Sequence, residues 1–161
     1  MSILAWLEAT GVARFVGESP SLLAYPTFST VHTIGLSIIV GLSTVVGLRL
    51  LGFAPTLRLA PLKKLFPIMW FAFAINLVSG SGLAAAAATQ TIPDPMFLAK
   101  ITCVLAAVAI LRVLQVKVFR DPDLEHKPMS ATTKYLAGAM LCLWLLGMIT
   151  GRVIAYKFFE G

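Results

Sequence analysis

The chain has 161 residues, of which 58% are hydrophobic and only 12% are charged, and its mean hydropathy is +0.90. Soluble domains carry about 25% charged residues, so this composition excludes an ordinary soluble protein and favours one whose surface faces lipid. The net charge of +6 comes from basic residues near the ends of apolar segments. That pattern sets membrane topology and gives no reason to expect a nucleic-acid partner.

The first predicted element is a short amphipathic helix over residues 2–17. Ser2 can accept a hydrogen bond from its first turn, and Glu8 and Arg14 supply polar positions in an otherwise apolar segment. Because Arg14 follows the apolar stretch, the segment is not a typical signal peptide. We expect the helix to lie at the membrane interface; the alternative is a short helix packed on the bundle.

Four longer apolar segments come next, each near the roughly 20 residues that cross a bilayer. They predict an all-α fold, a transmembrane four-helix bundle that forms a single membrane domain over residues 1–161. The prolines lie at segment ends or in loops, so no helix should be kinked in its middle. Short connections make sequential helices antiparallel neighbours. The spans are expected over residues 26–51, 65–89, 95–119 and 132–158.

The distribution of charge predicts the orientation in the membrane. Of 13 lysines and arginines, nine lie in or beside the first and third loops, residues 52–64 and 120–131, and four lie at the opposite side. By the positive-inside rule these loops are cytoplasmic, and both termini are periplasmic, in a bacterial inner membrane. No aspartate or glutamate lies inside a span, which argues against a proton relay or a cation path.

Two spans carry small residues at every fourth position, a spacing that lets helix backbones approach closely. In the second span the series includes Asn76, the one amide deep in a span, which we expect to form a hydrogen bond across helices. The series are Ala72, Asn76, Gly80, Ala84 and Ala88 in the second span and Gly147, Gly151 and Ala155 in the fourth.

His32 is the main candidate for chemistry. A histidine at this depth faces the bundle interior and bonds to something, and imidazole is a common ligand of haem iron and copper. The alternative is a structural histidine bonded to a backbone carbonyl or a serine of another helix. The other histidine, His126, lies in a loop at the opposite side and cannot be the second ligand of the same haem. Met140 and Met148 could complete a ligand set, although packing is the commoner role of methionine.

Lys100 and Arg152 are expected in the same membrane half as His32. Three groups that can be cationic, with no span carboxylate to neutralise them, predict an anionic partner such as haem propionates, a lipid headgroup or a quinone oxygen. The predicted cofactor-binding residues are therefore His32, Lys100 and Arg152, with His32 as the candidate metal ligand. In the alternative, Lys100 and Arg152 extend to the outer interface and share no site.

Several motifs stand near the ends of the first three spans. They are Tyr25-Pro26 with His32-Thr33-Ile34-Gly35, then Leu48-Arg49-Leu50-Leu51-Gly52, Pro67-Ile68-Met69-Trp70 and Phe97-Leu98-Ala99-Lys100. Over roughly residues 20 to 115 the chain thereby resembles a widespread uncharacterised family of small bacterial four-helix membrane proteins. The resemblance carries over His32, Arg49, Pro67, Trp70 and Lys100. One departure is Gly47, where that family usually has an aspartate, so a charge pair with Arg49 is lost.

That family is distantly similar to the copper-resistance D-like and b-type cytochrome membrane families, which place histidines on transmembrane helices for metal or haem. The resemblance implies a haem- or metal-associated protein with a redox role in electron transfer, centred on His32. Haem b is the first candidate cofactor and copper the second. Those families normally have more span histidines than one, and a homo-oligomer in which two copies each contribute a His32 would supply another.

Two other functions stay open. The chain could be a non-redox accessory or structural subunit of a larger membrane complex, or, third, a small-molecule transporter. The lack of a repeat, of broken helices and of span carboxylates weighs against transport. No catalytic set can be assembled, so we expect no enzymatic activity from the chain on its own. Cys103 and Cys142 lie in apolar segments and are expected to be buried free thiols.

Overall fold

The computed structural model describes residues 2–121 and 128–160, and of residues 155 and 157–160 it describes the backbone alone. The described residues form helices and no strand. Four of the helices are long and apolar enough to cross a membrane. These are α3 (Tyr25–Leu51), α4 (Leu65–Ala86), α6 (Pro95–Lys117) and α7 (Ala131–Glu160). The prediction of an all-α four-helix bundle is confirmed, and the four apolar helices are those of a multi-pass membrane protein.

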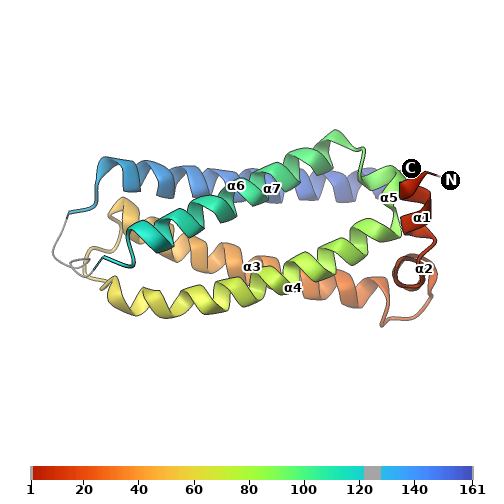
Figure 1. Cartoon of the computed structure of the whole chain (residues 1–161), viewed down its shortest axis with the longest axis horizontal. Coiled ribbons are helices and arrows are strands. Elements are labelled where there is room, and N and C mark those ends of the chain that lie inside the picture. Colours follow the sequence, from red (N-terminus) through yellow and green to blue (C-terminus); the bar gives the residue numbers. More distant parts are fainter. Residues whose placement is uncertain (1, 122–127, 161) are drawn as a thin grey trace.

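The long helices run along the molecule as two antiparallel pairs, α3 with α4 and α6 with α7, and α3 also packs against α7 (Figure 1). Three short helices, α1 (Ile3–Glu8), α2 (Gly11–Glu18) and α5 (Ala88–Thr91), lie at the end that holds the chain termini. The connections after α3 and α6 lie at the opposite end. We call the half of each long helix nearer the chain termini the terminal half, and the other the loop half.

The ends of the long helices follow local sequence. Pro26 lies in the first turn of α3, and Gly52 ends that helix with a φ of 107°, which a residue with a side chain rarely adopts. Asp94 caps α6 by accepting a hydrogen bond from the backbone N–H of Met96 at 2.6 Å. The second span differs from the expected residues 65–89, because the backbone leaves the helical conformation at Ala87 (φ −141°, ψ 48°). A 3₁₀ helix, η1 (Ala60–Lys64), leads directly into α4.

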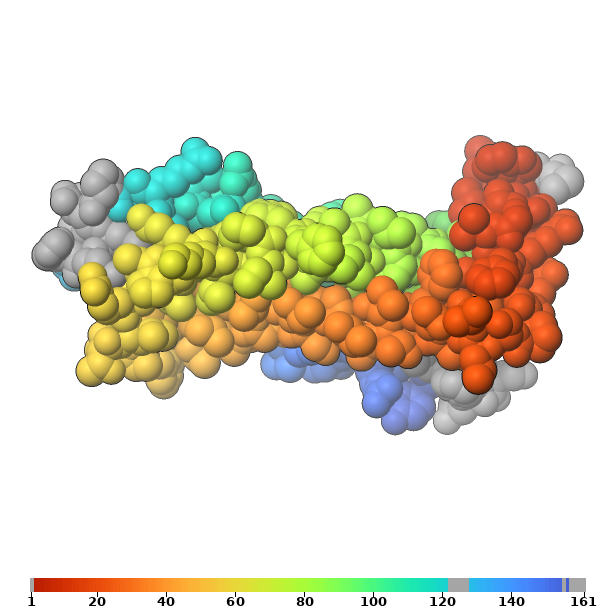
Figure 2. All heavy atoms as spheres, turned by 90° about the horizontal axis from the view of Figure 1, so that it is seen from below, coloured from red at the N-terminus to blue at the C-terminus, as the bar shows by residue number. Residues whose placement is uncertain are grey.

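The N-terminal segment forms two helices where one was predicted. Ser2 caps α1 as expected, but the chain turns at Thr10, whose hydroxyl accepts from the backbone N–H of Ala13 and donates to the carbonyl of Leu7. Helix α2 packs against α4 and buries Ala13 and Val16. The segment stands across the end of the bundle (Figure 2). It also leaves large apolar side chains exposed, among them Ile3, Trp6, Val12 and Phe15. It therefore combines packing on the bundle with an apolar surface suited to the interface.

The hydrophobic core lies in the loop half. Its fully buried members include Phe66 and Trp144, and none of the described members comes from residues 25–38, 73–106 or 145–160. Phe66 stacks edge-to-face on Phe119, with ring centroids 4.9 Å apart, which joins α4 to the end of α6. The buried residues of the long helices in the terminal half are small or polar: Gly35, Asn76, Ser79, Gly82 and Gly147. The fully buried large apolar side chains of the long helices therefore lie in the loop half, and partly buried ones such as Leu36 and Val104 extend the packing toward the terminal half.

Several members of the small-residue series lie at close helix contacts, while Ala88 lies in α5, beyond the end of α4. A Cβ added at Gly35 would lie 3.1 Å from the carbonyl oxygen of Ala72, so α3 and α4 approach closely there. Gly147 and Gly151 face α6, while the side chain of Ala155 lies outside the described part. The two cysteines are free thiols, but Cys103 is half-buried and Cys142 is exposed, so the prediction that both are buried was wrong. Their helix faces point partly to lipid, which suits an apolar thiol equally well.

Candidate functional site

The side chain of His32 reaches from α3 to α4 in the terminal half. Its Nδ1 atom lies 3.1 Å from the carbonyl oxygen of Asn76 and 3.3 Å from Oγ of Ser79. A carbonyl oxygen can only accept, so Nδ1 carries the ring proton and donates it. The Ser79 hydroxyl donates its own proton to the Ile75 carbonyl at 2.7 Å and so accepts from the ring. These are the backbone and serine contacts that the structural interpretation of His32 expected.

The other ring nitrogen, Nε2, is left without a partner. It makes no hydrogen bond to any described residue. It is also not fully enclosed by the protein, so it remains accessible. With the proton on Nδ1, Nε2 carries a lone pair. A histidine that donates one N–H to a backbone carbonyl and presents the other nitrogen has the arrangement typical of metal-ligating histidines, because the carbonyl fixes the tautomer and the ring orientation.

Asn76 also donates a hydrogen bond to His32. Its side-chain amide donates to the backbone carbonyl of His32 at 2.8 Å, so the two residues hold α3 and α4 together through reciprocal hydrogen bonds. The predicted hydrogen bond of Asn76 across helices is confirmed. Gly80 provides the space for the ring, since a Cβ there would lie 2.8 Å from Cε1 of His32. The imidazole is thereby fixed between two hydrogen bonds and a glycine.

Lys100 comes from the other helix pair, near the start of α6. Its chain packs on Gly151 of α7, where an added Cβ would lie 3.4 Å from Cε and 3.5 Å from Nζ of Lys100. Lys100 is half-buried and close enough to His32 for the two side chains to interact electrostatically. It makes no hydrogen bond or ion pair within residues 2–121 and 128–160. The imidazole of His32 and the amino group of Lys100 thus lie in the terminal half within range of electrostatic interaction across the two pairs.

Arg152 does not join them. Its side chain is exposed, and its guanidinium lies over the ring of Tyr156, 5.8 Å from the centroid. Although Arg152 follows Gly151 directly, the next helical position points about 100° away from the Lys100 contact. This placement matches the alternative in which Arg152 extends toward the interface by itself.

The other candidate ligands are not gathered around His32. Met140 is fully buried in the core of the loop half, and Met148 is exposed on α7. His126 lies outside the described residues. Within the described ranges no three His, Cys, Asp or Glu side chains come together as a metal site would require. The described structure therefore offers His32 as a single candidate ligand, without a complete set of metal ligands around it.

Sequence reasoning did not identify Ser79 as the serine that binds His32, and it missed a contact of Glu8. Ser79 completes the cradle of His32, and its position three residues after Asn76 on a helix was the available signal. At the terminal end of the bundle, Glu8 of α1 accepts from the backbone N–H of Thr89 at 2.8 Å and from its hydroxyl at 2.7 Å. These bonds hold the pKa of Glu8 below its ordinary value, the Thr89 hydroxyl contributing most. The contact had no local sequence signal, because 81 positions separate its partners.

Comparison of the chain with known protein families, with curated proteins and with solved structures found no match. The function of the chain must therefore be inferred from its fold and from the geometry of His32.

Proposed function

We propose that the chain is a membrane protein that holds a haem-type prosthetic group through His32 and has a redox role in electron transfer. The observation that carries the proposal is the orientation of the imidazole: Nδ1–H is bound to the Asn76 carbonyl, and Nε2 is free. A ring held in this way is preorganised to donate the Nε2 lone pair to an iron centre.

The residues around His32 fit a haem b in two respects. Nε2 supplies an axial ligand, and Lys100 supplies a positive charge without a described partner, which suits an anionic propionate. Both groups lie in the terminal half, where the buried residues of the long helices are small or polar. Haem, when bound, supplies one-electron redox chemistry; the chain's part is to orient one ligand and to place a compensating charge. A second axial ligand from another copy in a homo-oligomer is part of the same proposal.

The site suits a bare copper ion less well. A copper centre needs several N or S ligands, and among the described residues no group of three or more His, Cys, Asp or Glu side chains includes His32. The ammonium group of Lys100 would also repel a cation bound at Nε2. Among the predicted cofactors, the donor set therefore favours haem b over copper.

The test is an absorption spectrum of protein purified in mild detergent from cells supplied with haem, recorded oxidised and after dithionite. We expect a Soret band that sharpens and shifts on reduction in the native chain. His32→Ala should lose the band, and free imidazole should restore part of it by occupying the vacated ligand position. Lys100→Gln should keep the band with weaker haem retention.

Matched controls separate ligation from helix packing. Ser79→Ala removes a hydrogen bond of the same cradle but leaves Nε2 in place, so its spectrum should stay close to native. Size-exclusion profiles of all variants report whether they remain folded. A flat spectrum in the native chain, or a band that survives in folded His32→Ala, would refute the proposal.

The reciprocal bonds of His32 and Asn76 support a second candidate, a non-redox accessory subunit in which the histidine serves helix packing alone. It predicts no bound pigment and co-purification with a larger membrane complex. For either function we propose the orientation given by the positive-inside rule, with residues 52–64 and 120–131 cytoplasmic and both termini periplasmic. Fusing a reporter enzyme that works only in the cytoplasm to each terminus tests it.

A further inference from the structure

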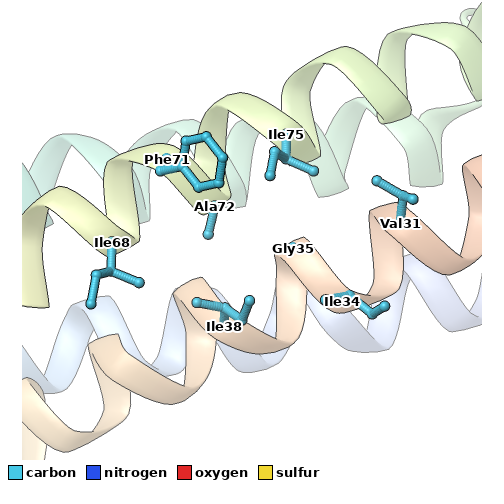
Figure 3. A pocket seen from close by; sticks show the side chains of 8 residues that line it. All are labelled: Val31, Ile34, Gly35, Ile38, Ile68, Phe71, Ala72 and Ile75. Atoms are coloured by element: carbon cyan, nitrogen blue, oxygen red, sulfur yellow. The ribbon is translucent and has the colours of Figure 1, made fainter.

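The lipid-facing side of the α3–α4 pair carries an apolar groove (Figure 3). Four residues of α3 between Val31 and Ile38 and four of α4 between Ile68 and Ile75 line it, and its volume is about 140 Å³. All eight lining residues are apolar. His32, Gly80 and Lys100 are not among the residues that line the groove, so its lining differs from the proposed haem site.

The shape of the groove comes from the close approach of the two helices. Gly35 and Ala72 form its floor, where the lack of large side chains lets the backbones meet. The walls are large side chains that stand out on either side, with Ile34 55% and Phe71 69% exposed. Because no described element covers these walls, they face the hydrocarbon of the bilayer. The groove is thus open to the bilayer along one side, so that a flexible apolar chain can enter it.

Positive charge stands at the loop end of the groove. Lys64 is exposed and is the last residue of η1, directly before α4 and four residues before Ile68. The segment 52–64 also contains Arg58 and Lys63, both exposed, and no acidic residue. An occupant of the groove therefore meets several exposed basic side chains where the chain leaves the membrane.

The dimensions match one leaflet of the bilayer. Eleven residues separate Lys64 from Ile75, which is about 16 Å at the rise of an α-helix, and half of the hydrocarbon core is about 15 Å thick. An acyl chain lying along Ile68–Ile75 would therefore bring its headgroup to the level of Lys64. A second copy docked here with the same orientation would instead set two basic clusters side by side, which disfavours that occupant.

We propose that this groove is a binding site for an anionic phospholipid, with one acyl chain over Gly35 and Ala72 and the phosphate at Lys64. The acyl chain fills an apolar space that bulk lipid enters only transiently, and the headgroup gains the attraction of the basic segment. The site would select anionic over zwitterionic lipids of the same chain composition.

The test is native mass spectrometry of the full chain in detergent, titrated with palmitoyl-oleoyl phosphatidylglycerol or with phosphatidylcholine of the same chains. The native chain should retain one phosphatidylglycerol in preference to phosphatidylcholine. Lys64→Gln should weaken retention about fivefold, the factor that one lost basic contact at an anionic surface is worth. Lys134→Gln, at an exposed position of the same end on α7, is the matched control and should change retention little.

A second pair of variants tests the groove itself. Phe71→Ala removes an exposed wall and should weaken retention of both lipids, whereas Val78→Ala, at an equally exposed position of α4 outside the groove, should not. Since all four side chains are exposed, the variants should fold. Equal retention of the two lipids, or equal effects within each matched pair, would overturn the proposal. So would a protein dimer that Phe71→Ala dissociates in the absence of lipid, because the groove would then hold a second copy.

Discussion

Replacing Gly80 by alanine tests whether the imidazole of His32 is held rigidly against α4. The added Cβ would lie 2.8 Å from Cε1 of the ring, closer than folded structures tolerate, and 3.1 Å from Nδ1. The ring must therefore move away, and its hydrogen bond to the Asn76 carbonyl must lengthen or break. The same substitution in a His32→Ala background meets no ring and should be harmless.

The magnitudes of three effects decide whether Gly80→Ala raises or lowers the free energy of unfolding. Glycine to alanine inside a helix is favourable by about 0.8–1 kcal/mol. Overpacking costs about 1–3 kcal/mol, and a lost hydrogen bond between membrane helices about 0.6 kcal/mol. Gly80→Ala should then lower the free energy of unfolding by about 1–3 kcal/mol in the native chain and raise it by about 1 kcal/mol in His32→Ala. The coupling energy between the two positions is therefore about 2–4 kcal/mol.

The assay is reversible unfolding in mixed detergent micelles, with Gly41→Ala as calibration. Gly41 lies in the same α3 helix as His32, and a Cβ there would meet nothing within 4 Å, so Gly41→Ala reports the helix-propensity gain alone. Rigid placement of the ring is refuted if Gly80→Ala changes the free energy of unfolding by the same amount, in the same direction, in the native and the His32→Ala backgrounds. That result would mean that the ring moves freely and that Nε2 has no fixed direction.

Three further predictions concern other parts of the bundle. Because hydrogen bonds from Thr89 hold the pKa of Glu8 below its ordinary 4.5, their contribution is present above that value and lost as the pH falls through the lowered pKa. After correction for the intrinsic exchange rate at each pH, the hydrogen-exchange protection of α1 should fall in acid, and Glu8→Gln should remove this pH dependence. Ser43→Ala should raise the free energy of unfolding by roughly 1 kcal/mol, because the hydroxyl is fully buried without a described partner; a clear loss in thermal stability would contradict this. Gly47→Asp, which restores the aspartate of the resembling family, should destabilise by at least about 1–3 kcal/mol, since a Cβ at Gly47 would lie 2.9 Å from Leu141. Leu141→Ala in the same chain should recover part of that loss, and an unchanged melting temperature for Gly47→Asp alone would argue against tight packing there.

The helical architecture could be predicted because a small number of physical constraints determine it. Long apolar segments must form helices in lipid, and prolines and glycines mark their ends. The pairing of His32 with Asn76 was also accessible in outline, since polar groups at membrane depth seek partners on neighbouring helices. Which atoms pair could not be predicted, because this depends on the rotation of each helix about its axis. For the same reason Arg152 was grouped with Lys100, although neighbouring positions on a helix point in different directions.

Of the two interruptions of helical structure, one could be predicted from the sequence and the other could not. The turn at Thr10 had a local signal, since a threonine followed by glycine is a common helix start. The break at Ala87 had none, because it interrupts a run of alanines that favours helix. There the terminal helices pack on the backbone: a Cβ at Gly17 would lie 3.2 Å from the Ala86 carbonyl, and Glu8 binds Thr89 just beyond. Tertiary contacts thus override the local preference.

The central claim is that His32 donates through Nδ1 and presents an unprotonated Nε2. The most direct measurement is nitrogen NMR of the detergent-solubilised chain without added cofactor, labelled with ¹⁵N-histidine in a His126→Gln background, where His32 is the remaining histidine. We expect a protonated Nδ1 and a Nε2 resonance of the pyridine type, which shifts or broadens when haem is added. A proton on Nε2 with a bare Nδ1, unaffected by haem, would contradict the claim.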